Sequence, residues 1–276
     1  MIYHMKKNYL LIGVAAVLLG GCCATKTSTA AQASKGESAL IANGKLWSSY
    51  FQQNAAEYEA LCLQAFNVAQ LRLDEALAKK GDKPLAIVTD IDETFLDNSP
   101  FEAYCAKKGI SYSQEAWEEW TVLGDAKPLA GALDFFTYAD SKGVTIFYVT
   151  NRLEKEREGT AKNLRKYNFP FPSDSRLILR TAEKSKENRR LQIAKDYDIV
   201  LLMGDNLSDF AKDFDNRTPE GRSEAVHNNR NEFGKRFIIL PNYSYGDWEG
   251  AAYGNKYSIP AEQKELIIKN KTKAFK

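Results

Sequence analysis

The feature that most constrains the fold is the alternation of short apolar runs with longer helical stretches. The runs lie at residues 85–88, 144–149, 177–179, 199–203 and 237–240. Continuous apolar runs separated by helices are typical of strands that are buried on both faces of a parallel sheet. The sequence therefore predicts an α/β fold with a Rossmann-like parallel sheet flanked by helices.

Polar side chains follow three of these runs. The run at 85–88 leads into Thr89-Asp90-Ile91-Asp92, the run at 144–149 into Thr150, and the run at 199–203 into Gly204-Asp205. Ligands of open parallel sheets bind beyond the carboxyl ends of the strands. We therefore expect the functional site at this edge of the sheet.

Two helical regions accompany the predicted sheet. Between Trp47 and Leu77 apolar residues recur every three or four positions, which predicts one long amphipathic helix or two in line, within an N-terminal extension at 46–82. Its aromatic stripe is interpreted as core packing. The interval from Phe95 to Pro128 has no convincing strand, so we expect a helical cap at about 98–128 on a core that spans 83–276.

The first residues predict export and lipidation. Lys6 and Lys7 precede an apolar run from Leu10 to Leu19, which describes a signal peptide at 1–21 and is shorter than the roughly 20 residues of a spanning helix. The sequence ending at Cys22 resembles a bacterial lipobox, in which that cysteine is lipidated; the alternative is an ordinary secretory signal. Residues 22–45 are predicted to be a flexible tether. We expect an envelope lipoprotein, in the outer membrane.

Composition excludes several classes of protein. The 276 residues include 38 basic and 36 acidic side chains, and this near-neutral balance argues against a nucleic-acid binder. Only two histidines occur, which argues against two-histidine phosphatases and HExxH proteases. The cysteines Cys62 and Cys105 could form a disulfide in an oxidising compartment or remain buried thiols, and the sequence leaves both open.

The strongest local signal for chemistry is the pair Asp90 and Asp92. Two carboxylates at a strand end can converge on one ligand, and their repulsion is costly without a cation. Mg²⁺ prefers oxygen ligands and pairs with phosphate. A second acidic strand end, with Asp205 and Asp209, strengthens this interpretation; a purely structural metal site is the alternative.

Four ordered stretches resemble the motifs of the haloacid dehalogenase superfamily of phosphohydrolases. They are Asp90-Ile91-Asp92-Glu93-Thr94, then Thr150, then Lys186, then Asp205 with Asp209. Within that superfamily the chain resembles the class C acid phosphatases, which are bacterial secreted or lipid-anchored enzymes. The similarity extends from about Trp47 to Tyr257.

This resemblance implies an acid phosphatase that works through an aspartyl-phosphate. Asp90 would attack phosphorus, and Asp92 would protonate the leaving alkoxide and later activate water. Mg²⁺ would be held by the carboxylates of Asp90 and Asp205 and by the backbone carbonyl of Asp92.

The remaining motif residues would bind the transferring phosphoryl group. Thr150 and the neighbouring Asn151 amide would hydrogen-bond its oxygens, and Lys186 would neutralise its charge. Asp209 would orient that lysine or support the metal. Each has a simpler alternative: Thr150 ends a strand, Lys186 belongs to a solvated basic face, or Asp209 begins a helix.

The resemblance also implies small phosphomonoester substrates, with nucleoside 5′-monophosphates prominent. The aromatic candidates for stacking on a base are Phe101, Tyr104, Tyr243 and Tyr245, and core packing is the alternative. Phe101 stands where the family usually has tyrosine. A competing function is an envelope lipoprotein that binds nucleotides or another ligand without catalysis. Self-association into a homo-oligomer is left open.

Overall fold

The computed structural model describes residues 38–275, apart from residues 80 and 172. The predicted signal peptide, the lipidation site at Cys22 and the first part of the tether therefore lie outside the described residues. Of the helices in this part of the chain, none combines the length and the apolar character that a bilayer-spanning segment needs.

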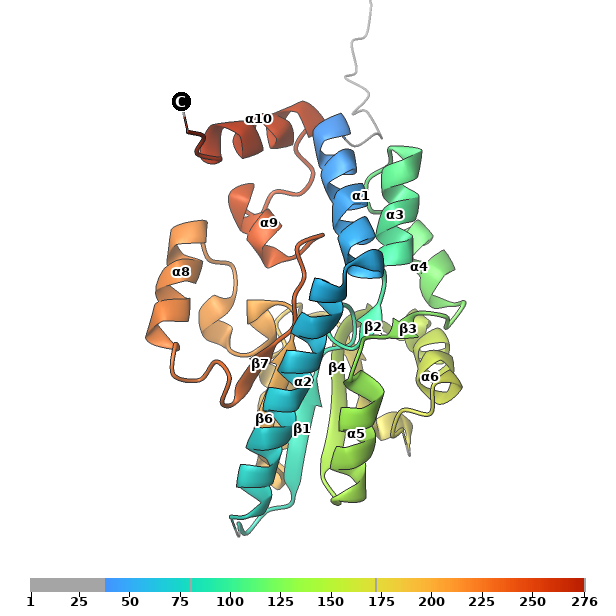
Figure 1. The fold of residues 1–276 in the computed structure, drawn as a ribbon, viewed down its shortest axis with the longest axis vertical. Helices are drawn as coiled ribbons and strands as arrows, with labels where there is room; N and C mark the ends of the chain where they lie inside the picture. Colours follow the sequence, from blue (N-terminus) through green and yellow to red (C-terminus); the bar gives the residue numbers. More distant parts are fainter. Residues whose placement is uncertain (1–37, 80, 172, 276) are drawn as a thin grey trace, which may run out of the picture. The chain divides into compact units, whose positions relative to one another are not determined.

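The described chain forms a five-stranded parallel sheet, as the sequence predicts. Its strands are β1 (Leu85–Thr89), β4 (Thr145–Leu153), β5 (Leu177–Arg180), β6 (Asp198–Gly204) and β7 (Phe237–Ile239). Their order across the sheet is β5-β4-β1-β6-β7, so that β1 lies at the centre (Figure 1). The strands that carry the polar ends, β1, β4 and β6, are therefore neighbours.

Both faces of the sheet are buried, which explains why the strands read as continuous apolar runs. On β1, Ile87 belongs to one hydrophobic cluster, and Ala86 and Val88 belong to the other. Helices α2 (Ala56–Leu77) and α5 (Ala132–Ser141) contribute to the first cluster, and α7 (Glu187–Asp196) contributes to the second. Figure 1 shows α2 and α5 crossing one face of the sheet.

The N-terminal extension consists of two helices, α1 (Ala39–Asn54) and α2 (Ala56–Leu77), joined at Ala55 in an extended conformation. The prediction that the tether runs to residue 45 is wrong from residue 39 onward. The Ser38 hydroxyl accepts a hydrogen bond from the Ile41 amide at 3.2 Å and caps this earlier helix start. Asn43 and Gly44 separate this first turn from the periodic apolar pattern that begins at Trp47.

The cap contains the helices α3 (Ser99–Lys108) and α4 (Gln114–Thr121). Contrary to the expectation of no strand here, β2 (Leu96–Asp97) and β3 (Lys127–Pro128) pair antiparallel at its base. Two residues per strand are too few for a periodic pattern to be recognised. Figure 1 shows α3 and α4 beyond the carboxyl end of the sheet, beside α1.

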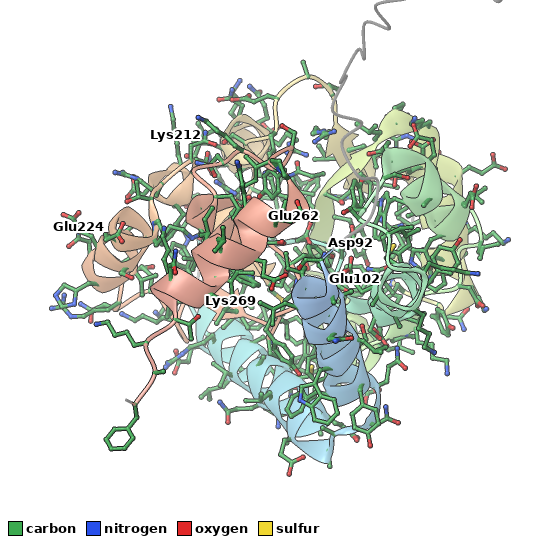
Figure 2. The ribbon with its side chains drawn as sticks, turned by 90° about the horizontal axis from the view of Figure 1, so that it is seen from above. Asp92, Glu102, Lys212, Glu224, Glu262 and Lys269 are labelled. Atoms are coloured by element: carbon green, nitrogen blue, oxygen red, sulfur yellow. The ribbon has the colours of Figure 1, made fainter. Side chains whose placement is uncertain are left out.

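The rest of the chain completes the layers around the sheet. The further α-helices are α6 (Arg157–Lys166), α8 (Pro219–Asn228), α9 (Asp247–Ala252) and α10 (Ala261–Lys271). No residue of α10 is buried, and Figure 2 shows its Glu262 and Lys269 at the surface. Short 3-10 segments lie at η1 (Glu154–Glu156), η2 (Asp174–Arg176), η3 (Leu207–Asp209) and η4 (Lys212–Phe214).

The two cysteines within the described residues are free, buried thiols, so the disulfide alternative does not hold. Cys62 lies on α2 and Cys105 lies on α3. Burial raises the pKa of the Cys62 thiol to about 12, which keeps it protonated and unreactive at neutral pH.

Candidate active site

A tight turn after β1 carries the first acidic motif. Glu93 adopts a left-handed backbone conformation with φ 54°, which is uncommon outside glycine. The carbonyl of Ile91 accepts hydrogen bonds from the amides of Thr94, Phe95 and Leu96 at 3.1–3.3 Å. The chain therefore reverses just after Asp92 and keeps both aspartates at the end of the sheet.

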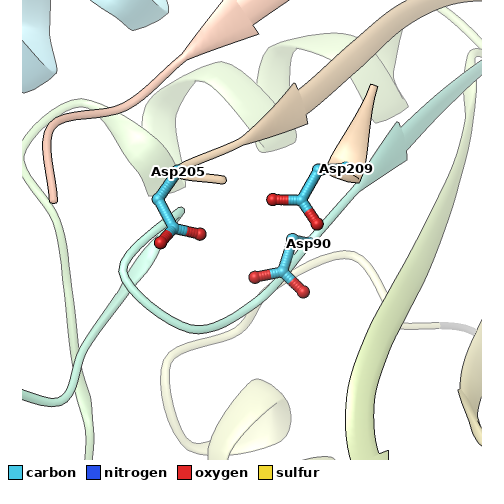
Figure 3. Close-up of side chains that lie close together, drawn as sticks. All are labelled: Asp90, Asp205 and Asp209. Carbon is cyan, nitrogen blue, oxygen red and sulfur yellow. The ribbon is translucent and has the colours of Figure 1, made fainter. Parts of the chain in front are cut away.

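Three carboxylates converge at this point. Oxygen atoms of Asp90, Asp205 and Asp209 lie within 4.8 Å of one another (Figure 3). They come from the end of β1, from the residue after β6 and from η3, respectively. Gly204 permits this approach, because a Cβ atom there would lie 2.4 Å from the Cβ of Asp209. We call these three side chains the acid cluster.

Lys186 is the cation that faces the acid cluster. Its side chain is only 6% exposed, and its ammonium group pairs with Asp90 and lies 2.6 Å from Asp209 Oδ1. Burial alone would lower the pKa of Lys186, but Asp209 and Asp90 raise it, so that the lysine stays charged. The solvated basic face suggested for Lys186 is therefore wrong.

The acid cluster carries more negative charge than Lys186 balances. Burial raises the pKa of Asp90 to about 7; Lys186 opposes this rise, and Asp209 and Asp92 add to it. Burial, with Asp209 and Asp90, also raises the pKa of Asp205 well above its usual value. Three carboxylates and one ammonium leave an excess charge that a divalent cation would neutralise, so these residues fit a metal site.

Two neutral side chains orient Asp205. The Asn242 side-chain amide donates to Asp205 Oδ2 at 2.7 Å, and the Thr94 hydroxyl donates to Asp205 Oδ1 at 3.3 Å. The backbone amide of Asp205 donates to the same Thr94 hydroxyl at 3.1 Å. Such supporting hydrogen bonds fix the direction in which a metal-binding carboxylate points.

The side chain of Asp92 lies in a different environment from the acid cluster. Its carboxylate forms a salt bridge with Arg152, whose Nη2 lies 2.7 Å from Asp92 Oδ1. Asn98 Nδ2 donates to the same oxygen at 2.9 Å. Burial opposes the positive charge of Arg152, but Asp92 and other acids raise its pKa, so the guanidinium remains charged. The positive charge of Arg152 therefore balances the negative charge of the Asp92 carboxylate.

Thr150 and Asn151 lie in the C-terminal half of β4 and are held by Arg189 from α7. Arg189 Nη1 donates to the carbonyl of Thr150 at 2.6 Å, and Nη2 donates to Asn151 Oδ1 at 2.7 Å. The Thr150 hydroxyl accepts a hydrogen bond from the backbone amide of Arg152 at 3.1 Å. Arg189 therefore connects the Thr150 segment of β4 to α7, the helix that follows Lys186.

The predicted aromatic residues do not share one environment. Phe101 is 3% exposed and packs edge-on against Trp117, so its ring belongs to the core of the cap. Tyr245 is engaged with Glu93, to which its hydroxyl donates. Tyr104 and Tyr243 are 47% and 43% exposed, and they retain accessible ring surface.

Sequence reasoning assigned no role to several polar residues of the site. Arg152, Asn98 and Glu93 are buried and contact one another through Asp92 or the turn around it. All three lie within the range from about Trp47 to Tyr257 that resembles the family. The sequence signal for Arg152 was its position two residues after Thr150. The direction in which its side chain points depends on the fold and could not be predicted.

Comparison with known proteins identifies the family. A model described as HAD superfamily, subfamily IIIB (Acid phosphatase), matches residues 23–248. The chain belongs to this family of phosphoric monoester hydrolases. The class C acid phosphatase from Bacillus anthracis with tungstate bound is similar over 87% of this chain and 100% of its own, with 40% identity and a TM-score of 0.83. A second structure of that enzyme matches with 40% identity and a TM-score of 0.82.

More distant relatives match slightly less than half of this chain. A class B acid phosphatase from Rahnella sp. (strain Y9602) is 28% identical over 47% of this chain and 58% of its own length. Acid phosphatase 1 from Solanum lycopersicum is 27% identical over 44% of this chain and 50% of its own. The matches span between half and three fifths of the length of these two relatives. The predicted family is confirmed, and the two class C structures cover 87% and 86% of this chain.

Proposed function

We propose that this protein is a Mg²⁺-dependent acid phosphatase of the cell envelope, acting on small phosphomonoesters and most readily on nucleoside 5′-monophosphates. The observation that carries the proposal is the acid cluster with Lys186 at the carboxyl ends of β1 and β6. It combines a nucleophile, a cation and an excess of negative charge at one point.

In the first step Asp90 attacks phosphorus. A bond forms between an Asp90 carboxylate oxygen and phosphorus while the bond to the leaving oxygen breaks. Asp92 gives its proton to that oxygen, so that a neutral alcohol departs. Lys186, which pairs with Asp90, and the Thr150 hydroxyl would bind the transferring oxygens and offset their charge.

In the second step a water molecule attacks the phosphorus of the aspartyl-phosphate. Asp92 takes a proton from this water as the bond between phosphorus and Asp90 breaks, which releases inorganic phosphate and restores both residues. Bound Mg²⁺ would supply positive charge to the phosphoryl group, held by Asp90, Asp205 and the backbone carbonyl of Asp92. Asp209 keeps Lys186 in place.

Two features support a nucleoside 5′-monophosphate as the substrate. Tungstate, found in the Bacillus anthracis enzyme, is a tetrahedral oxyanion with the charge and shape of phosphate. The exposed rings of Tyr104 and Tyr243 are the residues best suited to stack on a base, an interaction of about 1–3 kcal/mol. The predicted lipidation of Cys22 supports the envelope location.

The Asp90→Asn variant tests this proposal. It keeps the shape of the side chain but removes the nucleophile, so phosphate release from p-nitrophenyl phosphate and from a nucleoside 5′-monophosphate should fall by about 1,000-fold or more. Asp213→Asn, at an exposed aspartate, is the matched control and should keep full activity. Undiminished turnover by Asp90→Asn would exclude the mechanism. Tight nucleotide binding by the wild-type protein with Mg²⁺ and no phosphate release would instead favour a binding lipoprotein.

A further inference from the structure

Helix α4 of the cap carries no reacting group, yet two of its side chains contact the partners of Asp92. The ring of Trp117 lies beneath the guanidinium of Arg152, with 5.7 Å between the ring centroid and Cζ. Arg152 in turn donates from Nε to both oxygens of Asp92, at 3.1 and 3.2 Å, and from Nη2 to Oδ1. This is the first connection between α4 and Asp92.

The second connection runs through Asn98. Trp120 donates its indole N–H to Asn98 Oδ1 at 2.7 Å, and Asn98 Nδ2 donates to Asp92 Oδ1 at 2.9 Å. Asn98 is fully buried, and its backbone amide donates to Glu93 at 2.7 Å. The bond from Trp120 fixes which end of the Asn98 amide faces Asp92, because an indole can only donate.

The two oxygens of Asp92 are therefore unequal. Oδ1 accepts from Arg152 Nε, Arg152 Nη2 and Asn98, whereas the hydrogen bond to Oδ2 comes from Arg152 Nε alone, at 3.2 Å. The proton that a general acid gives away resides on the oxygen with fewer donors directed at it. This geometry assigns the proton-carrying role to Oδ2.

We infer that α4 positions Asp92 for proton transfer to the leaving oxygen, with Trp120 acting through Asn98 and Trp117 acting through Arg152. The inference rests on the proposed phosphatase function and deepens it. Trp117, Trp120, Asn98 and Arg152 are positioning residues. The cap therefore contributes to the proton transfer as well as to the pocket, although it lies outside the strand ends that carry the reacting groups.

The leaving group provides a specific readout of this role. An alkoxide is strongly basic and needs the proton from Asp92 as the bond breaks, whereas p-nitrophenolate is a good leaving group and needs it little. Misplacing Asp92 should therefore slow alkyl phosphates more than p-nitrophenyl phosphate. A general loss of folded protein would slow both substrates by the same factor.

The experiment compares kcat/KM for a nucleoside 5′-monophosphate and for p-nitrophenyl phosphate in the full chain with Mg²⁺, because kcat/KM reports the step in which the leaving group departs and not the hydrolysis of the aspartyl-phosphate that both substrates share. Trp120→Phe keeps an aromatic ring and removes the N–H, and we expect kcat/KM for the nucleotide to fall about tenfold more than kcat/KM for the aryl ester. Arg152→Lys keeps the charge but loses the two-pronged contact, and should shift the ratio in the same direction. Glu119→Gln, exposed on the same helix, is the matched control and should leave the ratio unchanged.

The outcomes separate this inference from the proposed function. If the wild-type protein releases phosphate from neither substrate, the proposed function is wrong. If it hydrolyses both, and Trp120→Phe lowers the two kcat/KM values equally or leaves them unchanged, then α4 does not position Asp92. If Trp120→Phe does not fold, Trp117→Leu, which removes the ring beneath Arg152, decides by its ratio of the two kcat/KM values. Trp117→Phe should keep most of the ratio, because a ring still lies beneath Arg152.

Discussion

The two halves of the site hold their aspartates in opposite ways. On the side of β1 and β6, Asp90, Asp205 and Asp209 share one lysine, and burial raises the pKa values of Asp90 and Asp205. On the side of the cap, Asp92 meets one arginine and one amide. One half keeps an excess of negative charge, and the other is balanced.

This difference indicates a division of labour within one short motif. An excess of buried negative charge is costly unless a cation occupies the site, so the acid cluster is suited to binding metal and phosphate. A balanced, doubly bonded carboxylate gains little from a metal but is precisely oriented, as a proton donor must be. Asp90 and Asp92 are two residues apart, yet the fold assigns them to different halves.

The largest expected effect comes from removing Lys186, the cation that pairs with the acid cluster. Lys186→Met keeps the length of the side chain but leaves the facing carboxylates of Asp90 and Asp209 without their partner. Breaking a buried ion pair by removing one partner typically costs about 3–5 kcal/mol. We expect a lower free energy of unfolding in urea together with a loss of phosphatase activity.

Lys184→Met is the matched control for this prediction. Lys184 lies two residues away, with its side chain 60% exposed and paired with Asp247. Exposed pairs contribute little to stability. A loss of stability in Lys184→Met as large as that in Lys186→Met would contradict the special role of the buried lysine.

Two glycines allow each half of the site to be disturbed separately. In Gly204→Ala the new Cβ would meet the side chain of Asp209, and in Gly159→Ala it would lie 2.3 Å from the carbonyl oxygen of Thr121, at the end of α4. Each should lower the free energy of unfolding by about 1–3 kcal/mol. Gly204→Ala should weaken metal binding, and Gly159→Ala should change the ratio of alkyl to aryl turnover.

These two variants serve as controls for each other. Metal affinity is measured by calorimetry, and the turnover ratio is measured with the nucleotide and p-nitrophenyl phosphate. If both variants change both quantities to the same extent, the two halves are not independent, and the comparison fails.

The smallest expected effect concerns pH. Asp90, with a pKa near 7, and Asp205, with a raised pKa, hold protons in the metal-free protein that a metal must displace. Mg²⁺ affinity should therefore weaken as the pH falls, by about fivefold between pH 7 and pH 6 for each proton released. Calorimetry in two buffers with different heats of ionisation measures that proton release. Affinity that is constant between pH 6 and pH 8 would contradict it.

The same pKa shifts determine whether the metal-free protein becomes more or less stable as the pH rises. A carboxyl whose pKa is higher in the folded than in the unfolded state stabilises the fold below its unfolded pKa. That contribution is lost as the pH rises from about 4 through about 7. Thermal unfolding with EDTA should therefore show stability falling over this interval, and Mg²⁺ should restore more of it at pH 7.5 than at pH 5.

The parts of the molecule that were predicted from sequence depend on local patterns. The five apolar runs became the five strands because both faces of the sheet are covered, and Asp90 and Asp205 follow strands that the fold makes neighbours. Strand-end position was enough to bring them together. The family resemblance added Lys186, which no local pattern distinguishes from Lys184.

The parts that were not predicted depend on contacts between distant segments. Arg152 turns toward Asp92 because Trp117, 35 positions earlier in the chain, lies beneath it. The start of α1 at Ala39 depends on the cap that Ser38 provides and on the burial of Ile41 and Ala42 in the first turn. Such features follow from three-dimensional packing and leave no periodic signal.

The attachment of the cap has a consequence for how substrates reach the site. Asn163 on α6 holds residue Ala126 from both sides, accepting from its amide at 3.0 Å and donating to its carbonyl at 2.8 Å. Gly159 brings the backbone of the same helix against the end of α4. A swinging lid would have to break these backbone contacts in every cycle. We therefore expect a fixed entrance, whose width selects substrates by size before any chemistry begins and makes bulky phosphate esters poor competitors.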